Sequence, residues 1–276
     1  MGVKSMGKQP AGKGLVLLEL LTVIAILALL IALLIPMFLR AQEQSGRIRC
    51  QNQLREIGLA ILSYRNDNRG RLPLAASDMP PTSEPSGPED ESEMPVELPE
   101  LRPDNVSVAI FILLRTHNLS PSLFVCPSTN AVPDDFEGQP RWKRSNFTDV
   151  RRNLGYSMQN PCLNGSVARA GFTWSRYANP DFAIMADINP GIRGDEDHVL
   201  AIAPNFPRQT LRWGNSNNHA KRGQNVLFAD GRVDFFETPF VGVDHDNIYT
   251  TKNNTIIDAP ADQDDSILLP TDDQGE

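Results

Sequence analysis

The sequence predicts an α+β protein in which one long N-terminal helix, apolar in its first half, packs on a small antiparallel β-sheet with long loops. Three observations lead to this class. An apolar run of helical length comes first, and an amphipathic helical pattern continues directly after it. Short strand-like segments, two of them joined by Asp-Gly, follow in the second half of the chain. A long helix followed by hairpin-linked strands is an α+β arrangement.

The apolar run, residues 15–39, contains one charged side chain, Glu19. As a helix it is about 37 Å long, and a bilayer core is about 30 Å thick. It lacks the polar face of a soluble core helix, and it is too long for a secretory signal peptide. The run therefore predicts a transmembrane helix. A charge inside such a span costs roughly 2.5–3.5 kcal/mol, which makes Glu19 a functional candidate unless it reaches the interface.

The residues around Glu19 resemble the cleavage and methylation signal of type IV prepilins and of the pseudopilins of type II secretion. Lys13-Gly14 precedes Leu15-Val16-Leu17-Leu18-Glu19, and Pro36 stands where many pilin helices have a kinking proline. The resemblance implies a leader over residues 1–14, which a prepilin peptidase removes by cutting between Gly14 and Leu15. The same enzyme methylates the new N-terminus. Phenylalanine is usual in the family where this chain has Leu15.

The resemblance also implies a role for Glu19. In a stack of subunits the carboxylate pairs with the new α-amine of a neighbour, so two charges that are costly in hydrocarbon become one ion pair. The expected partners are prepilin peptidase, other pilin or pseudopilin subunits and the inner membrane. The expected topology is a single pass through the inner membrane, with a cytoplasmic N-terminus and a periplasmic or cell-surface domain. The net charge of −8 argues against a nucleic-acid partner.

The helix is expected to continue over residues 40–70 as an exported segment, ending where Gly70 can cap it and Pro73 forbids quick resumption. Its apolar stripe consists of Ile48, Leu54, Ile57, Gly58, Ile61 and Leu62. Residues 71–105 are rich in Pro, Ser and Glu and are predicted to form a flexible loop.

A globular α+β domain is predicted over residues 106–257, followed by an acidic, solvated tail over 258–276. The domain should open with a short amphipathic helix over 106–117. Strand candidates are Leu154–Met158, Phe182–Ala186, Val199–Ala203, Val226–Ala229 and Arg232–Phe236. Asp230-Gly231 joins the last two and predicts a type I′ turn.

The segment "NNHAKRGQNVLFADGRVDFF" carries a second resemblance, to the prepilin-associated domain named for a histidine, nine residues and Asp-Gly. Here ten residues separate His219 from Asp230-Gly231, and the extra one is expected in the turn over residues 220–223. Two roles for His219 stay open. One is a hydrogen bond that pins the turn to the hairpin, and the other is metal ligation.

The three cysteines are Cys50, Cys126 and Cys162. In an exported chain one disulfide is expected, with one thiol left over. We favour Cys50–Cys126, because it would tie the long helix to the globular domain, and three buried thiols are the alternative. No C-x-x-C pair is present, which disfavours a zinc knuckle or a thioredoxin-like site.

No cofactor is required by the sequence, and calcium is the one candidate ion. Its candidate ligands are Asp187, Asp195 and Asp197 in "DINPGIRGDEDH", since calcium takes oxygen ligands from such loops. The common catalytic motifs are absent, so no enzyme activity is expected. The function predicted is a filament subunit. The alternative is a membrane-anchored binding module whose loops at 75–105 and 187–198 bind envelope polymer, calcium or an exported substrate.

Overall fold

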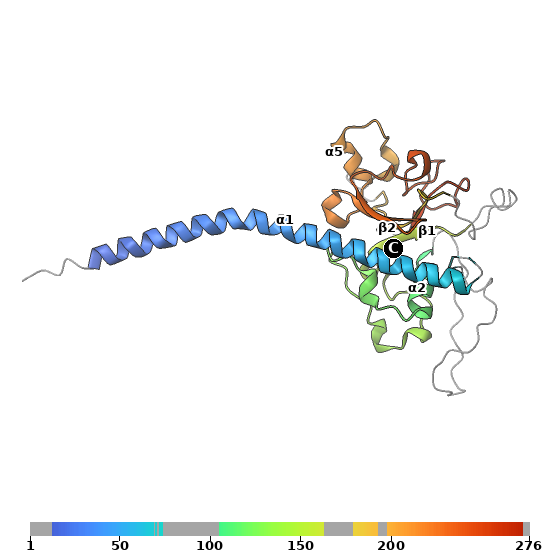
Figure 1. The fold of residues 1–276 in the computed structure, drawn as a ribbon, viewed down its shortest axis with the longest axis horizontal. Helices are drawn as coiled ribbons and strands as arrows, with labels where there is room; N and C mark the ends of the chain where they lie inside the picture. Colours follow the sequence, from blue (N-terminus) through green and yellow to red (C-terminus); the bar gives the residue numbers. More distant parts are fainter. Residues whose placement is uncertain are drawn as a thin grey trace, which may run out of the picture. The chain divides into compact units, whose positions relative to one another are not determined.

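The computed structural model describes residues 13–68, 70, 72–73, 105–162, 179–192 and 198–272. The chain divides into two units, Met1–Ser45 and Gly46–Glu276. Helix α1, Lys13–Asp67, is continuous and contributes to both units (Figure 1). The structure confirms the α+β class, with a long apolar N-terminal helix and a small antiparallel sheet. Most of the predicted leader and most of the predicted loop over 71–105 lie outside the described residues.

The first unit contains the apolar part of α1. Its large side chains are exposed: 64% of Leu21, 56% of Ile31 and 68% of Phe38 are accessible. By length and composition this helix can cross a membrane. Pro36 lies inside it and has no N–H to donate to the carbonyl of Ala32, yet the helix continues.

In the second unit α1 buries one stripe against the domain. The stripe runs through Cys50, Leu54, Ile57, Ile61 and Tyr64, all at most 2% exposed. These positions repeat at helical spacing and belong to one core cluster with side chains of α2 and of the sheet. The predicted stripe was wrong at its edges, because Ile48 and Leu62 are 58% and 43% exposed.

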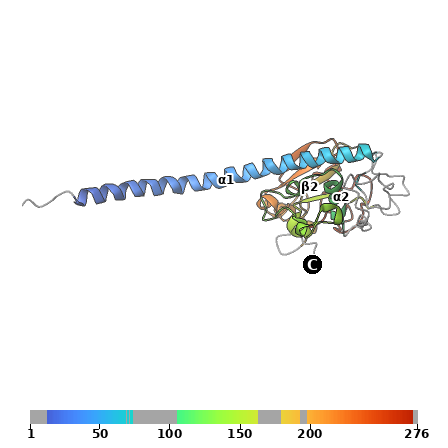
Figure 2. The same ribbon diagram turned by 90° about the horizontal axis from the view of Figure 1, so that it is seen from below.

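The sheet has five strands in the order β4-β3-β2-β1-β5, and every neighbouring pair is antiparallel. The strands are β1 (Tyr156–Gln159), β2 (Ala183–Asp187), β3 (Gln224–Phe228), β4 (Val233–Phe236) and β5 (Leu268–Leu269). A second cluster, which contains Ala186, Val226, Phe228, Tyr249 and Leu268, packs the sheet against C-terminal segments. Figure 2 shows the second half of α1 along one side of this unit, near α2 and β2.

Helix α2, Ser107–Thr116, is buried at every position from Ser107 to Leu114. The predicted amphipathic pattern was therefore wrong, because α2 lies inside the core rather than on it. The remaining helices are short: α3 (Val150–Asn153), α5 (Arg208–Leu211) and the 3₁₀ turns η2 (Pro121–Phe124), η3 (Phe136–Gly138), η4 (Arg141–Lys143), η5 (Val199–Ala201), η6 (Arg212–Gly214), η7 (Asn218–Lys221) and η8 (Val243–His245).

Two further predictions were wrong. Val199–Ala201 forms η5, where a strand was predicted over Val199–Ala203, and Ala201 N–H donates to the carbonyl of His198. The supposed solvated tail contains β5, which pairs with β1 through Met158↔Leu269 and Gln159↔Leu268. Residues 265–271 are buried, because the apolar triplet Ile267–Leu269 outweighs the surrounding aspartates.

The β3–β4 hairpin is present, but its turn differs from the predicted type I′. Of Asp230-Gly231, only Gly231 has a positive φ, 87°. Gly231 N–H donates to Phe228 O, and Phe228 N–H donates to Arg232 O. This is a type I turn followed by a left-handed glycine, the usual three-residue hairpin loop.

Stability of the second unit should fall as pH rises. Burial, then repulsion by Asp265, raises the pKa of Asp246 from 3.8 to about 7, and burial also raises the pKa of Asp265. A carboxyl whose pKa is higher in the folded chain stabilises it at acidic pH, and that contribution is lost between about pH 4 and pH 7. We expect the free energy of unfolding of Asp246→Asn to increase relative to that of the wild type as the pH rises from 5 to 8.

The gain should be on the order of 1–2 kcal/mol, because the carboxyl is partly exposed to water. The measurement is urea unfolding of both full chains in the same detergent at each pH. A difference between the two chains that does not change with pH would contradict this expectation.

Candidate functional site

The residues expected to act in processing and assembly lie on α1. The helix begins at Lys13, so the peptide bond between Gly14 and Leu15 lies in its first turn. Glu19 is exposed, and its backbone carbonyl accepts a hydrogen bond from the Thr22 hydroxyl at 2.8 Å. Glu19 therefore lies on the surface of the apolar helix, in its second turn.

A disulfide joins Cys50 of α1 to Cys126, which follows η2, and this is the pairing that the sequence favours. Their Cα atoms are 5.4 Å apart, and both residues are fully buried. The Tyr156 hydroxyl lies 3.2 Å from Cys50 Sγ and 2.7 Å from Gln53 Oε1. Cys162 is not part of the disulfide. The crosslink fixes the second half of α1 to the segment that follows η2.

His219 lies beside this disulfide, with Asp187 next to it. Its Nε2 atom is 3.7 Å from Cys126 Sγ and 3.3 Å from Asp187 Oδ2. Asp187 ends β2 and His219 belongs to η7, and both side chains are fully buried. One sulfur and one carboxylate oxygen thus converge on the same ring nitrogen.

Asparagines and a tyrosine hold this arrangement. Asp187 Oδ2 accepts the Asn225 backbone N–H at 2.7 Å, and Asp187 Oδ1 accepts Asn218 Nδ2 at 3.0 Å. The Tyr249 hydroxyl donates to the backbone carbonyl of Asp187 at 2.8 Å. Burial, then the Asp187 charge, raises the pKa of Tyr156 well above 10, so this phenol stays protonated as a donor.

The backbone at His219 adopts an unusual conformation. His219, Ala220 and Lys221 have φ values of 56°, 53° and 57°, and Gly223 has φ 147°. A left-handed conformation costs a non-glycine residue roughly 1–2 kcal/mol. This run falls where the sequence places the extra residue of the histidine motif. Such strain persists only where surrounding structure enforces it, and here it aims the imidazole into the core.

The other predicted site residues lie elsewhere or outside the described residues. Asp230 is part-exposed in the β3–β4 turn, where its Oδ1 accepts the Arg232 N–H, so the carboxylate beside His219 is Asp187. Asp195 and Asp197 are outside the described residues. The atoms nearest to the Asp187 carboxylate include nitrogen and sulfur, whereas calcium prefers a shell of oxygen.

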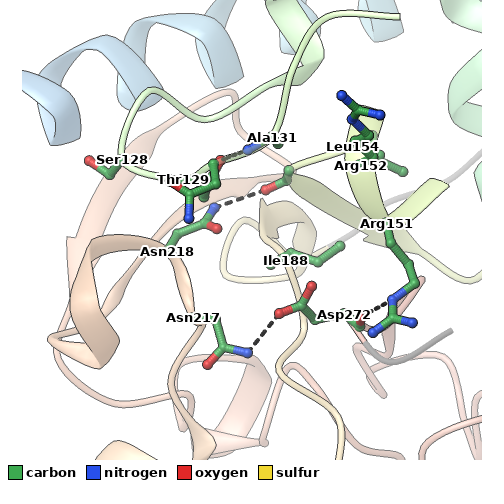
Figure 3. Close-up of a pocket in the computed structure, with 12 residues that line it drawn as sticks. Ser128, Thr129, Ala131, Arg151, Arg152, Leu154, Ile188, Asn217, Asn218 and Asp272 are labelled. Atoms are coloured by element: carbon green, nitrogen blue, oxygen red, sulfur yellow. Dashed lines mark hydrogen bonds between the residues drawn. The ribbon is translucent and has the colours of Figure 1, made fainter. Parts of the chain in front are cut away.

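A pocket of about 510 Å³ opens on the domain near this cluster. Asn217 Nδ2 donates to Asp272 Oδ2 at 2.7 Å, and Arg151 Nε donates to the Asp272 carbonyl at 3.2 Å (Figure 3). Asn218 and Gly155 also line it, and Asn218 Nδ2 donates to both Gly155 O and Asp187 Oδ1. The pocket wall is therefore in direct contact with the buried cluster.

Comparisons with family models, with curated proteins and with solved structures found no match for this chain.

Proposed function

We propose that this chain is a pilin-like structural subunit, cut between Gly14 and Leu15 by a prepilin peptidase and assembled into a type IV pilus-like or type II secretion-like filament. The observation that carries the proposal is the order of residues at the N-terminus. Glycine, then a glutamate four residues after Leu15, then a long apolar run form a processing signal joined to a membrane span.

The continuous helix supports the same proposal. A filament subunit needs an apolar helix for packing and a covalent connection from it to the exported domain. Helix α1 runs unbroken from Lys13 to Asp67, and one stripe of its second half is buried against the domain and crosslinked through Cys50. In this mechanism the apolar helices pack together, Glu19 binds the neighbour's α-amine, and the domain stays outside the membrane.

Mass spectrometry of the chain from its native membranes tests the processing step. We expect the mature N-terminus at Leu15, with its α-amine methylated. The matched control is Gly14→Val. This variant should be expressed at the same level as the wild type but should not be cleaved, so it should retain residues 1–14. A wild-type chain that still begins at or near Met1 would contradict processing and would indicate a permanent membrane anchor.

A second candidate function, an anchored binding module, is favoured by the pocket of Figure 3. Its volume suits a small polar ligand, and Arg151 and Arg152 line it. If the chain has this function, its monomeric full-length form in detergent should bind envelope glycan. Binding that survives Arg151→Ala together with Arg152→Ala would remove the pocket from consideration.

A further inference from the structure

Four side chains that can bind a metal ion meet at the disulfide, and two of them are its own cysteines. Among the described residues, the ligand atoms of Cys50, Cys126, Asp187 and His219 all lie within 4.8 Å of one another, and all four residues are buried. They come from α1, the segment after η2, the end of β2 and η7. Two sulfurs, an imidazole nitrogen and a carboxylate oxygen make a donor set that suits zinc.

The spacing also fits a tetrahedral centre. With zinc bonds of about 2.3 Å to sulfur and about 2.0–2.2 Å to nitrogen and oxygen, tetrahedral edges are about 3.6 Å for S···N and about 3.4 Å for N···O. Cys126 Sγ lies 3.7 Å from His219 Nε2, and that nitrogen lies 3.3 Å from Asp187 Oδ2. These two distances are therefore close to the edges expected of a tetrahedral centre.

A catalytic relay would be built differently. In a nucleophile–histidine–carboxylate relay the carboxylate binds one ring nitrogen and the nucleophile binds the other. Here the sulfur and the carboxylate both face Nε2 of His219. Several metal-binding atoms that face one point are the arrangement found around a bound metal ion. Full burial of these atoms is typical of a structural zinc site.

The surroundings supply outer-shell partners. Asn218 and Asn225 orient the Asp187 carboxylate, and the Tyr156 hydroxyl lies at hydrogen-bond distance from Cys50 Sγ. Hydrogen bonds of this kind orient metal ligands and tune their basicity. The pocket lies next to the cluster, because Asn218 forms part of its wall and donates to Asp187 Oδ1.

We propose that Cys50, Cys126, His219 and Asp187 form a zinc site in the reduced chain, and that the Cys50–Cys126 disulfide is the oxidised, metal-free form of the same centre. A thiol or phosphine reductant supplies two electrons, and two protons complete the two thiols. Zinc binding then releases both thiol protons as the sulfurs become thiolates. The sulfurs move from about 2.05 Å apart to about 3.8 Å. This proposal is independent of filament assembly.

Zinc stoichiometry of the full chain in detergent is the first test. One sample is reduced with a phosphine under argon and the other is kept oxidised, and both are equilibrated with zinc and dialysed. We expect one equivalent of zinc on the reduced chain and none on the oxidised chain. Cobalt should give the reduced chain thiolate-to-metal charge-transfer bands and the intense visible bands of a tetrahedral site. Equal zinc in both samples, or cobalt spectra without thiolate bands, would overturn the proposal.

Alkylation mapped by mass spectrometry identifies the ligands without any mutation. Zinc should protect Cys50 and Cys126 in the reduced chain and leave the reactivity of Cys162 unchanged. The control variant Cys162→Ser should bind zinc as the wild type does, whereas Cys126→Ser should lose about half of the thiolate-to-cobalt intensity, since one of two thiolates remains. If Cys126→Ser does not fold, the wild-type protection pattern decides. Unchanged alkylation of Cys50 and Cys126 would overturn the proposal.

Discussion

Replacing Glu19 with alanine should leave the chain in the membrane and abolish its incorporation into filaments. The substitution removes a charge that costs roughly 2.5–3.5 kcal/mol inside a span, so insertion should not suffer. It also removes the proposed partner of the neighbour's α-amine. Because breaking a buried ion pair costs about 3–5 kcal/mol, incorporation should fall at least about 100-fold at equal protein level. The measurement is the ratio of subunit in sheared filaments to subunit in carbonate-washed membranes.

A matched control is available on the same helix. Glu56 is an exposed glutamate of α1 in the second unit, and Glu56→Ala should assemble as the wild type does. Glu19→Gln keeps the side-chain size and removes the charge, so it should fail in the same way as Glu19→Ala. Normal assembly of Glu19→Gln would indicate that the side chain acts through packing, and normal assembly of Glu19→Ala would refute the proposed ion pair.

The parts of the fold with a strong local signal could be predicted from the sequence. Apolar continuity and then helical periodicity predict one helix from about residue 15 to 68, and α1 runs from Lys13 to Asp67. The Asp-Gly signal located the β3–β4 hairpin, although the turn type depends on the φ of Asp230, which composition does not reveal. Strand β5 was missed because two leucines among aspartates become a strand only when β1 is there to pair with them.

The buried cluster shows a different limit. Cys126, Asp187 and His219 each stand in a segment that the sequence marks as distinctive, but the sequence does not say which of these segments come together in the fold. The histidine motif directs attention to Asp230. The structure instead brings Asp187 to His219, because β2 pairs with β3 and its last residue lies next to Asn225. The absence of a C-x-x-C motif does not argue against a metal site here, because the four side chains come from four separate parts of the chain.

Replacing Asp187 with alanine should strongly destabilise the oxidised, zinc-free chain. Its carboxylate accepts the Asn225 N–H and Asn218 Nδ2 and faces His219 Nε2, all inside the core. Alanine would remove the acceptor of the buried Asn225 N–H and leave Asn218 Nδ2 with the Gly155 carbonyl alone, at a cost of about 3–5 kcal/mol. Asparagine keeps the shape and one oxygen, so Asp187→Asn should cost about 1–3 kcal/mol.

The comparison that isolates this effect uses Asp181, which lies just before β2 and binds Arg232 Nη2 at 2.7 Å. That pair is 62% and 40% exposed, so Asp181→Ala should cost less than about 1 kcal/mol. The measurement is urea unfolding of all full chains in one detergent with a chelator present. Equal midpoints for Asp187→Ala and Asp181→Ala would mean that water reaches the buried cluster and solvates the orphaned donors.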